Sequence, residues 1–222
     1  MKIGLKYLTY GMLALILIAS VYALAIGHYS VTFLGLLAAA ICSIPTIVQR
    51  KLHIIVPGEV TFLVALTLFL HTGGFSFQWY LDFYPYYDKL AHLIAAITVA
   101  FVIFLAVLIM IRISSRLQLE RWQIFLFVVI FTLAFGVIWE IWEFMFDTFL
   151  GSFFTIPLQH GNTDTLLDLV SDLAGGIIVA FLGTYILKRK NAHNWAETFL
   201  ESEFRKNEGP SQEKESPDSH GI

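Results

Sequence analysis

The sequence predicts an all-α fold, a polytopic transmembrane helical bundle. Hydrophobic residues make up 57% of the 222 residues and charged residues only 14%, and the mean hydropathy is +0.72. These values lie outside the range of ordinary soluble domains. The apolar residues form long stretches without the alternating pattern of a membrane β-barrel. Since only helices and closed barrels satisfy their backbone hydrogen bonds in lipid, we expect the stretches to be helices.

Six apolar stretches are long enough to cross a hydrocarbon core of about 30 Å as helices. They cover residues 7–27, 31–49, 54–73, 88–112, 122–147 and 164–187. Their short connections predict one transmembrane domain over residues 1–190. Residues 191–222 are rich in polar and charged side chains, which predicts a cytoplasmic polar tail that is mostly disordered.

The distribution of Lys and Arg predicts the orientation in the membrane. Of the 14 basic residues, all but Lys89 lie at the N-terminus, in the second and fourth connections, or after the last span. These segments share one side of a six-span protein. The positive-inside rule therefore places both termini in the cytoplasm.

The first span has a second interpretation. Lys2 and Lys6, an apolar run and the small-residue triplet at 23–25 are together similar to a secretory signal peptide. The apolar run at 8–26 is longer than the usual core of such a peptide, which favours a retained first span. Cleavage would leave the other five predicted crossings unchanged.

Ionisable side chains gather at the predicted outer ends of the last three spans. Residues three or four apart share a helix face, so each span carries one polar line. These lines are Asp88 and His92; Glu140, Glu143 and Asp147; and Asp164, Asp168 and Asp172. At about 1.5 Å of rise per residue, the third line reaches roughly 12 Å into the membrane. The three lines are expected to face one another in one pocket that opens to the outside.

The three polar lines predict a functional site because they place ionisable side chains inside the membrane. Each intramembrane carboxylate costs roughly 2.5 to 3.5 kcal/mol on insertion scales, and several close anions cannot all stay ionised without a partner. Because Lys89 is the one basic residue nearby, a metal ion or protons are the expected partners. The predicted metal ligands are Glu140, Glu143, Asp147, Asp164, Asp168 and Asp172.

The ligand types indicate which metal to expect and which groups would act beside it. A carboxylate-rich site suits Mg²⁺, Mn²⁺ or Ca²⁺, while His92, with His71 and His160 on the same side, keeps Zn²⁺ or iron open. The predicted catalytic residues are Asp88, Lys89 and His92. In that role His92 would be an acid or base, and Lys89 would contact phosphate.

Structural roles are the alternative for several of these residues. Near the membrane interface, Asp82, Asp147 and Asp164 can be rim or helix-terminus residues. The aromatic connection at 75–88 is typical of an interfacial belt, with a lid over the acidic site as the second interpretation. The functional interpretation is stronger for the deep carboxylates. These are Glu140, Glu143, Asp168 and Asp172.

Three segments resemble a known family. YDKLAH at 87–92, GVIWEIWE at 136–143 and DTLLDL at 164–169 resemble, in this order, the YjdF-like family of uncharacterised prokaryotic inner-membrane proteins. The first segment alone is similar, more weakly, to the VanZ-like membrane proteins. The resemblance covers residues 50–188 and implies a multi-span protein but no reaction. The motif positions it implies are Asp88, His92, Glu140, Glu143, Asp164 and Asp168.

Three functions remain open from the sequence. The favoured one is a metal-binding protein of the cell membrane, possessing an outward acidic site and acting as a metal-dependent enzyme on a lipid or lipid-linked phosphate. The second is a cation- or proton-coupled transporter, against which the apolar inner halves of the same spans argue. The third is a structural membrane protein. Membrane lipid is the expected partner, and no nucleic acid is expected.

Overall fold

The chain is described by a computed structural model that covers residues 3–52, 56–114, 116–151 and 157–189. Within these ranges it is all-helical and contains seven helices, as the sequence predicts for the fold class. They are α1 (Ile3–Ala25), α2 (Tyr29–Leu52), α3 (Gly58–Ser76), α4 (Trp79–Asp82), α5 (Tyr86–Ile113), α6 (Arg121–Leu150) and α7 (Asn162–Arg189). The predicted tail at 191–222 lies outside the described residues.

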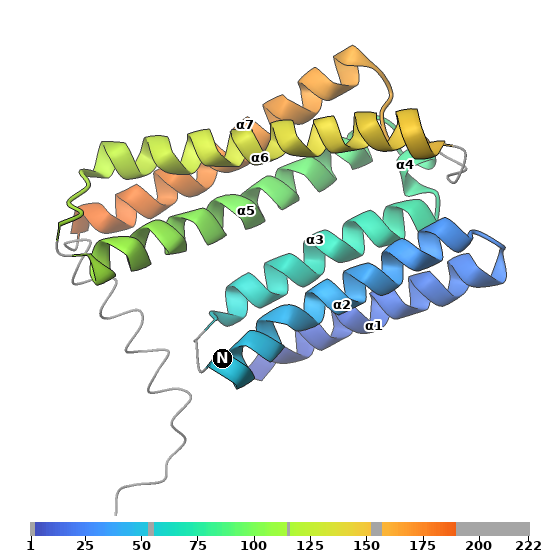
Figure 1. Cartoon of the computed structure of the whole chain (residues 1–222), viewed down its shortest axis with the longest axis horizontal. Coiled ribbons are helices and arrows are strands. Elements are labelled where there is room, and N and C mark those ends of the chain that lie inside the picture. The colour runs from blue at the N-terminus through green and yellow to red at the C-terminus, as the bar shows by residue number, and fades with distance from the viewer. Residues whose placement is uncertain (1–2, 53–55, 115, 152–156, 190–222) are drawn as a thin grey trace, which may run out of the picture.

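The six long helices form two groups of three (Figure 1). In one group α1 packs on α2 and α3, and in the other α7 packs on α5 and α6. The two groups meet where α3 packs against α5, and the short α4 lies between the end of α3 and the start of α5. We call this the α4 end of the bundle. Because successive long helices run in opposite directions, α5 and α7 begin at the α4 end, where α6 finishes.

Among the described residues, five helices are long and apolar enough to cross a membrane, which is consistent with a multi-pass membrane protein. These are α1, α3, α5, α6 and α7, which match five of the six predicted stretches. The sixth, α2, is a helix as predicted, and its described residues include a shorter apolar stretch over Tyr29–Pro45. Length and composition therefore establish five candidate spans rather than six.

Local sequence explains where α6 and α7 begin. Glu120 and Gln123 form a capping box, in which the Gln123 side chain accepts the Glu120 backbone N–H at 2.7 Å. This pair satisfies backbone donors that the first turn leaves free. Before α7, Gly161 has a φ of +104°, a left-handed conformation that glycine adopts without a steric penalty. The turn lets α7 reverse direction and pack beside α6.

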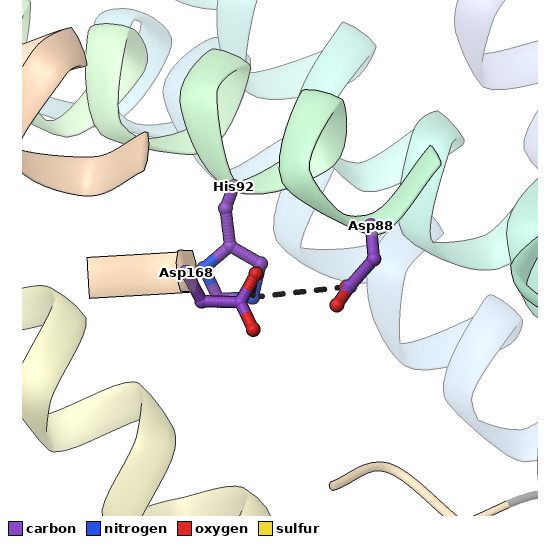
Figure 2. Close-up of side chains that lie close together, drawn as sticks. All are labelled: Asp88, His92 and Asp168. Atoms are coloured by element: carbon purple, nitrogen blue, oxygen red, sulfur yellow. Dashed lines mark ion pairs between the residues drawn. The ribbon is translucent and has the colours of Figure 1, made fainter. Parts of the chain in front are cut away.

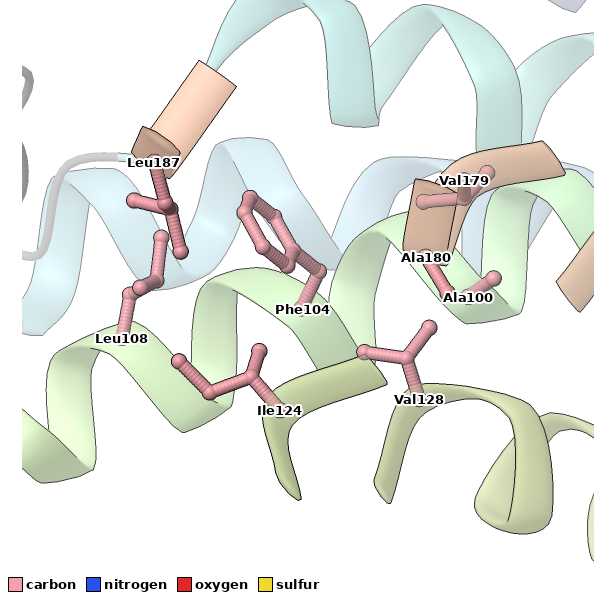
Figure 3. Close-up of a cluster of buried hydrophobic side chains, with 8 residues drawn as sticks. All are labelled: Ala100, Phe104, Leu108, Ile124, Val128, Val179, Ala180 and Leu187. Atoms are coloured by element: carbon pink, nitrogen blue, oxygen red, sulfur yellow. The ribbon is translucent and has the colours of Figure 1, made fainter. Parts of the chain in front are cut away.

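Figure 3 shows the apolar core of the second group. Side chains from α5, α6 and α7 meet there, with Phe104 and Val128 at 3% and 0% exposure. A methyl group on Gly183 would lie 2.6 Å from the Phe104 ring, so glycine permits this contact between α5 and α7. The buried members are Ala100, Phe104, Leu108, Ile124, Val128, Val179, Ala180 and Leu187.

Candidate functional site

The polar lines of α5, α6 and α7 converge at the α4 end of the bundle. Residues 88–92 of α5, 140–143 of α6 and 164–172 of α7 bring their side chains together in a network of ion pairs, defined here as the acidic cluster. Its residues are Asp88, Lys89, His92, Glu140, Glu143, Asp164, Asp168 and Asp172. Of these, His92, Glu140, Asp164, Asp168 and Asp172 are all at most 5% exposed. The structure thus places the predicted lines face to face.

Lys89 is the positive centre of one half of the acidic cluster. Its Nζ lies 3.0 Å from Asp88 Oδ2, 2.5 Å from Asp164 Oδ1 and 2.8 Å from the Asp168 carboxylate. The Lys89 side chain is only 17% exposed, so these pairs are weakly screened by solvent. One lysine thus bridges α5 and α7 and offsets part of the negative charge.

His92 is the centre of the other half (Figure 2). Its Nε2 lies 3.8 Å from Glu140 Oε1, 3.8 Å from Asp168 Oδ1 and 3.9 Å from Asp88 Oδ1. These distances exceed the 2.7 to 3.2 Å of an ordinary N–H···O hydrogen bond. Three carboxylates from three helices therefore surround one imidazole nitrogen without bonding directly to it.

Several oxygens of the acidic cluster are buried and have no hydrogen-bond partner. They are Glu140 Oε1, Asp172 Oδ2 and Asp168 Oδ1, of which the last still lies 2.8 Å from Lys89 Nζ in an ion pair. A buried oxygen without a partner costs about 1 to 3 kcal/mol, and more when it is charged. Two of the three, on Glu140 and Asp168, are the oxygens that face His92 Nε2. These two oxygens therefore suit a group placed between them and His92 Nε2, whereas Asp172 Oδ2 lies against Gly136 on the other side of the ring.

The second ring nitrogen of His92 faces α7. Its Nδ1 lies 3.4 Å from Asp172 Oδ1, slightly beyond hydrogen-bond length, so the Asp172 carboxylate faces Nδ1 while Nε2 faces the other carboxylates. Two glycines allow the close approach. A methyl group on Gly136 would collide with Asp172 Oδ2, and one on Gly175 would lie 2.7 Å from Ala96 Cβ. A histidine that binds a metal commonly has its other nitrogen held in this way.

The remaining members lie at the edges of the acidic cluster. Glu143 accepts a hydrogen bond from Trp139 Nε1 at 2.8 Å and is near enough to His92 and Glu140 to share an ion with them. Asp164 contacts Lys89 and also lies 3.5 Å from His160 Nδ1. Asp164 is therefore an ion-pair partner within the cluster as well as a first-turn helix residue.

Two predicted acidic residues are not brought into the acidic cluster. Both oxygens of Asp147 accept backbone N–H groups, from Leu158 at 2.9 and 3.0 Å and from Gln159 at 2.8 Å. Asp147 therefore anchors the segment before α7, and its lone pairs are engaged there. Asp82 is exposed at the end of α4, as its predicted place on the rim implies.

Sequence reasoning gave little weight to His71, which the structure ties to α4. Its Nδ1 lies 2.7 Å from the Tyr80 hydroxyl, and Tyr87 donates to the Leu70 carbonyl at 2.7 Å. Burial raises the pKa of Tyr80 well above its usual range, so its hydroxyl stays protonated. Helical spacing was an available signal, because Thr67, His71 and Gly74 stand four and three apart along α3.

The geometry fits a cation between His92 and the carboxylates. Two sets of ligand atoms come within 4.8 Å of one another, and His92 belongs to both. Ligands about 2.0 to 2.2 Å from a tetrahedral ion lie about 3.3 to 3.6 Å apart, and neighbouring ligands about 2.3 to 2.6 Å from Ca²⁺ lie about 3.3 to 3.7 Å apart at right angles, slightly less than the 3.8 to 3.9 Å at Nε2. The sets are Asp88, His92 and Asp168, and His92, Glu140 and Glu143.

Comparison with protein families gives one match. The family described as "Predicted membrane protein (DUF2238)" matches residues 7–189. The chain belongs to this family. Membership is consistent with the resemblance to the YjdF-like proteins, whereas the weaker resemblance to the VanZ-like proteins stays a prediction. No curated protein and no solved structure matches the chain.

Proposed function

We propose that this membrane protein binds a divalent cation in the acidic cluster, with His92, Glu140 and Asp168 as its central ligands. The single observation that carries the proposal is that two buried carboxylate oxygens without a hydrogen bond, on Glu140 and Asp168, both face His92 Nε2; the Asp168 oxygen is also in an ion pair with Lys89. Asp88 and Glu143 stand beside these ligands and would complete the coordination. Asp172 would orient His92 from the far side of its ring.

Charge supports a cation rather than a closed set of ion pairs. Six carboxylates meet two basic residues in the acidic cluster, and Lys89 already contacts three of the carboxylates. The Glu140, Glu143 and Asp172 carboxylates lie on the His92 side, where a divalent ion would supply positive charge. Mg²⁺, Mn²⁺ or Ca²⁺ suit the carboxylates, and the imidazole ligand also admits Zn²⁺ or iron.

The proposed activity is that of a metal-dependent enzyme acting on a lipid or a lipid-linked phosphate. A bound divalent cation would polarise a phosphoryl oxygen and make water a stronger nucleophile. Lys89 Nζ sits among Asp88, Asp164 and Asp168, where it limits their repulsion of an anionic substrate. His92 serves as a ligand in this proposal, instead of the acid or base that the sequence suggested.

Transport is the second candidate, and the apolar end of the same helices argues against it. A pathway must continue from the acidic cluster to the other side of the membrane. Beyond the cluster α5, α6 and α7 close on Phe104, Leu108 and Ile124, each at most 3% exposed. A pocket that is polar at one end and packed at the other favours binding or catalysis over conduction.

We also propose six crossings of the cell membrane with both termini in the cytoplasm. At 24 residues, α2 is about 36 Å long, enough to cross the hydrocarbon core. Single cysteines in a Cys42→Ala background would test this. Tyr29→Cys should react with a membrane-impermeant thiol reagent in intact cells, whereas Ile113→Cys should react only after permeabilisation. Reaction at both positions from outside would contradict the proposed topology.

The metal proposal is tested by elemental analysis of the full-length protein purified without chelators. We expect about one divalent ion per chain in the unmodified protein and less than a fifth of that in Asp168→Asn, Glu140→Gln and His92→Ala. Asp147→Asn should keep its metal because the structure engages that carboxylate with Leu158 and Gln159. The exposed Asp82→Asn is the matched neutral control.

Two results would contradict the proposal. One is an unmodified protein without stoichiometric metal that also fails to bind added Mg²⁺, Mn²⁺, Ca²⁺, Zn²⁺ or Fe²⁺. The other is equal metal loss in Asp147→Asn and Asp168→Asn, which would show that the ion is not centred on His92. A metal-bound protein should then be assayed for release of phosphate from a panel of lipid phosphates.

A further inference from the structure

Two apolar cavities lie between the two groups of helices, beside the acidic cluster. The first, of about 240 Å³, is lined by α3, α5, α6 and α7, and the second, of about 220 Å³, by α2, α3, α6 and Leu158. Leu68, His71 and Trp139 line both cavities, so the two adjoin at these residues. An apolar cavity of about 150 Å³ is enough to bind benzene, and each of these is larger. We call the pair the apolar chamber.

Polar groups line the apolar chamber where it meets the acidic cluster, along α3, and at Thr98 of α5 and Thr132 of α6, whose hydroxyls donate to backbone carbonyls of their own helices. His92 and Asp172 line the first cavity, and Glu143 lines the second. Elsewhere the walls are aliphatic or aromatic, as at Val64, Val99 and Leu34. A molecule that fills the chamber would therefore have a hydrocarbon part and a polar part, with the polar part at the proposed cation.

The length of the apolar chamber indicates the size of the hydrocarbon part. Along α3 its lining runs from Val64 to Phe75, which is about 16 Å at the rise of an α-helix. That is about half of a hydrocarbon core of about 30 Å, the depth of one leaflet. One acyl chain of a membrane phospholipid matches this length, whereas a long polyisoprenoid would extend beyond it.

We propose that the apolar chamber binds one acyl chain of a membrane phospholipid, with the lipid headgroup at the acidic cluster. The inference deepens the proposed function and rests on it for the position of the headgroup, because it names the lipid class that would present its phosphate to His92 and Lys89. The acyl chain would lie between α3 and α6. The His71 and Trp139 rings, with centroids 5.3 Å apart, form the wall that the two cavities share, so these side chains must rotate for one acyl chain to occupy both. Tyr80 contacts His71 on its other side.

Photolabelling of the full-length protein in phosphatidylcholine vesicles tests the inference. The probe is phosphatidylcholine with a diazirine on one acyl chain, and mass spectrometry maps the labelled residues. Labelling is expected at Leu68, Val99 and Trp139. It should fall at least fivefold in Ala95→Phe, which places a ring inside the first cavity, and stay unchanged in Ala106→Phe, which adds the same ring on the exposed face of α5.

A second pair of variants covers the possibility that Ala95→Phe does not fold. Leu37 is 46% exposed and lines the second cavity, so Leu37→Trp should block that cavity without straining a packed contact. Leu36→Trp, at a 55% exposed neighbour outside the lining, is its control. Equal labelling of each variant and its control would overturn the inference, as would labelling spread evenly over exposed residues such as Val102 and Phe181.

The identity of the lipid chain, acyl or polyprenyl, is tested separately from the metal site. A diazirine polyprenyl phosphate that labels the apolar chamber where the phospholipid probe does not would overturn the assignment to an acyl chain. Metal content is measured on the same samples. Normal metal content with labelling outside the chamber would refute the acyl-chain site alone. Chamber labelling in a protein that binds no metal would support the acyl-chain site and refute the proposed function.

Discussion

At the α4 end of α5, α6 and α7 the helices meet through charged side chains, whereas at the opposite end the same helices meet through apolar ones. Lys89 bridges Asp88, Asp164 and Asp168 at the first end, and Phe104 fills the contact with Gly183 at the second. Lipid is as apolar as the packed end, so that end gains mainly from close packing. At the charged end, burial removes water from the ionised side chains, which costs free energy. Ionisable residues that are kept in a membrane despite this cost usually mark a functional site.

The largest expected effect comes from removing the lysine of the charged end. Lys89→Met would leave Asp88, Asp164 and Asp168 without their common partner, and breaking a buried pair in this way costs about 3 to 5 kcal/mol. The free energy of unfolding in detergent measures the loss. Lys6→Met is the matched control, because Lys6 is exposed at the start of α1.

Adding metal to Lys89→Met provides a second test of this prediction. If a divalent cation and Lys89 neutralise neighbouring carboxylates, saturating Mn²⁺ should restore part of the stability lost in Lys89→Met, since a ligand of the folded state stabilises it. A loss below about 1 kcal/mol would show that the three carboxylates do not depend on the lysine.

A smaller effect is expected at the apolar end. Phe104→Ala would leave a cavity among Leu108, Ile124 and Gly183, and the cost should be near the lower limit of about 3 kcal/mol for Phe→Ala changes. The loss of stability should not exceed this value, because a side chain that leaves the core for lipid or detergent stays in an apolar environment. Unfolding in detergent again measures it, with exposed Val102→Ala as the control. Loss of bound metal in Phe104→Ala would contradict the separation of the two ends.

The smallest losses of stability are expected from Gly→Ala changes at two positions of α7 that face α5. Gly175 lies toward the charged end and Gly183 toward the apolar end. A methyl on Gly175 would meet backbone atoms, Ile97 N and Leu93 O, at 3.0 Å, whereas on Gly183 it would meet the Phe104 ring. Overpacking costs about 1 to 3 kcal/mol. Gly175→Ala should be the more destabilising, since backbone cannot rotate away, and should also weaken metal binding by separating His92 from Asp172. Equal metal affinity in the two variants would show that helix spacing does not position His92.

The acidic cluster was largely predictable because helical spacing assigns a side chain to a face. Asp164, Asp168 and Asp172 stand four apart, so they had to share one side of α7. The same spacing also placed Asp147 with Glu140 and Glu143, yet Asp147 turns to the N–H groups of Leu158 and Gln159. A loop that supplies backbone donors has no periodic pattern, so this partner was not foreseeable.

Hydropathy by itself determined the long helices, because a backbone in lipid must satisfy its own hydrogen bonds and apolar runs of sufficient length are the only ones that can cross. It also determined that the charges of α5, α6 and α7 lie toward one end. Only the tertiary structure decided that Lys89 reaches across to α7, that His92 stands between carboxylates of three helices, and that two cavities adjoin the acidic cluster. These contacts depend on the rotation and spacing of helices against one another, which packing sets and a single helix's periodicity does not.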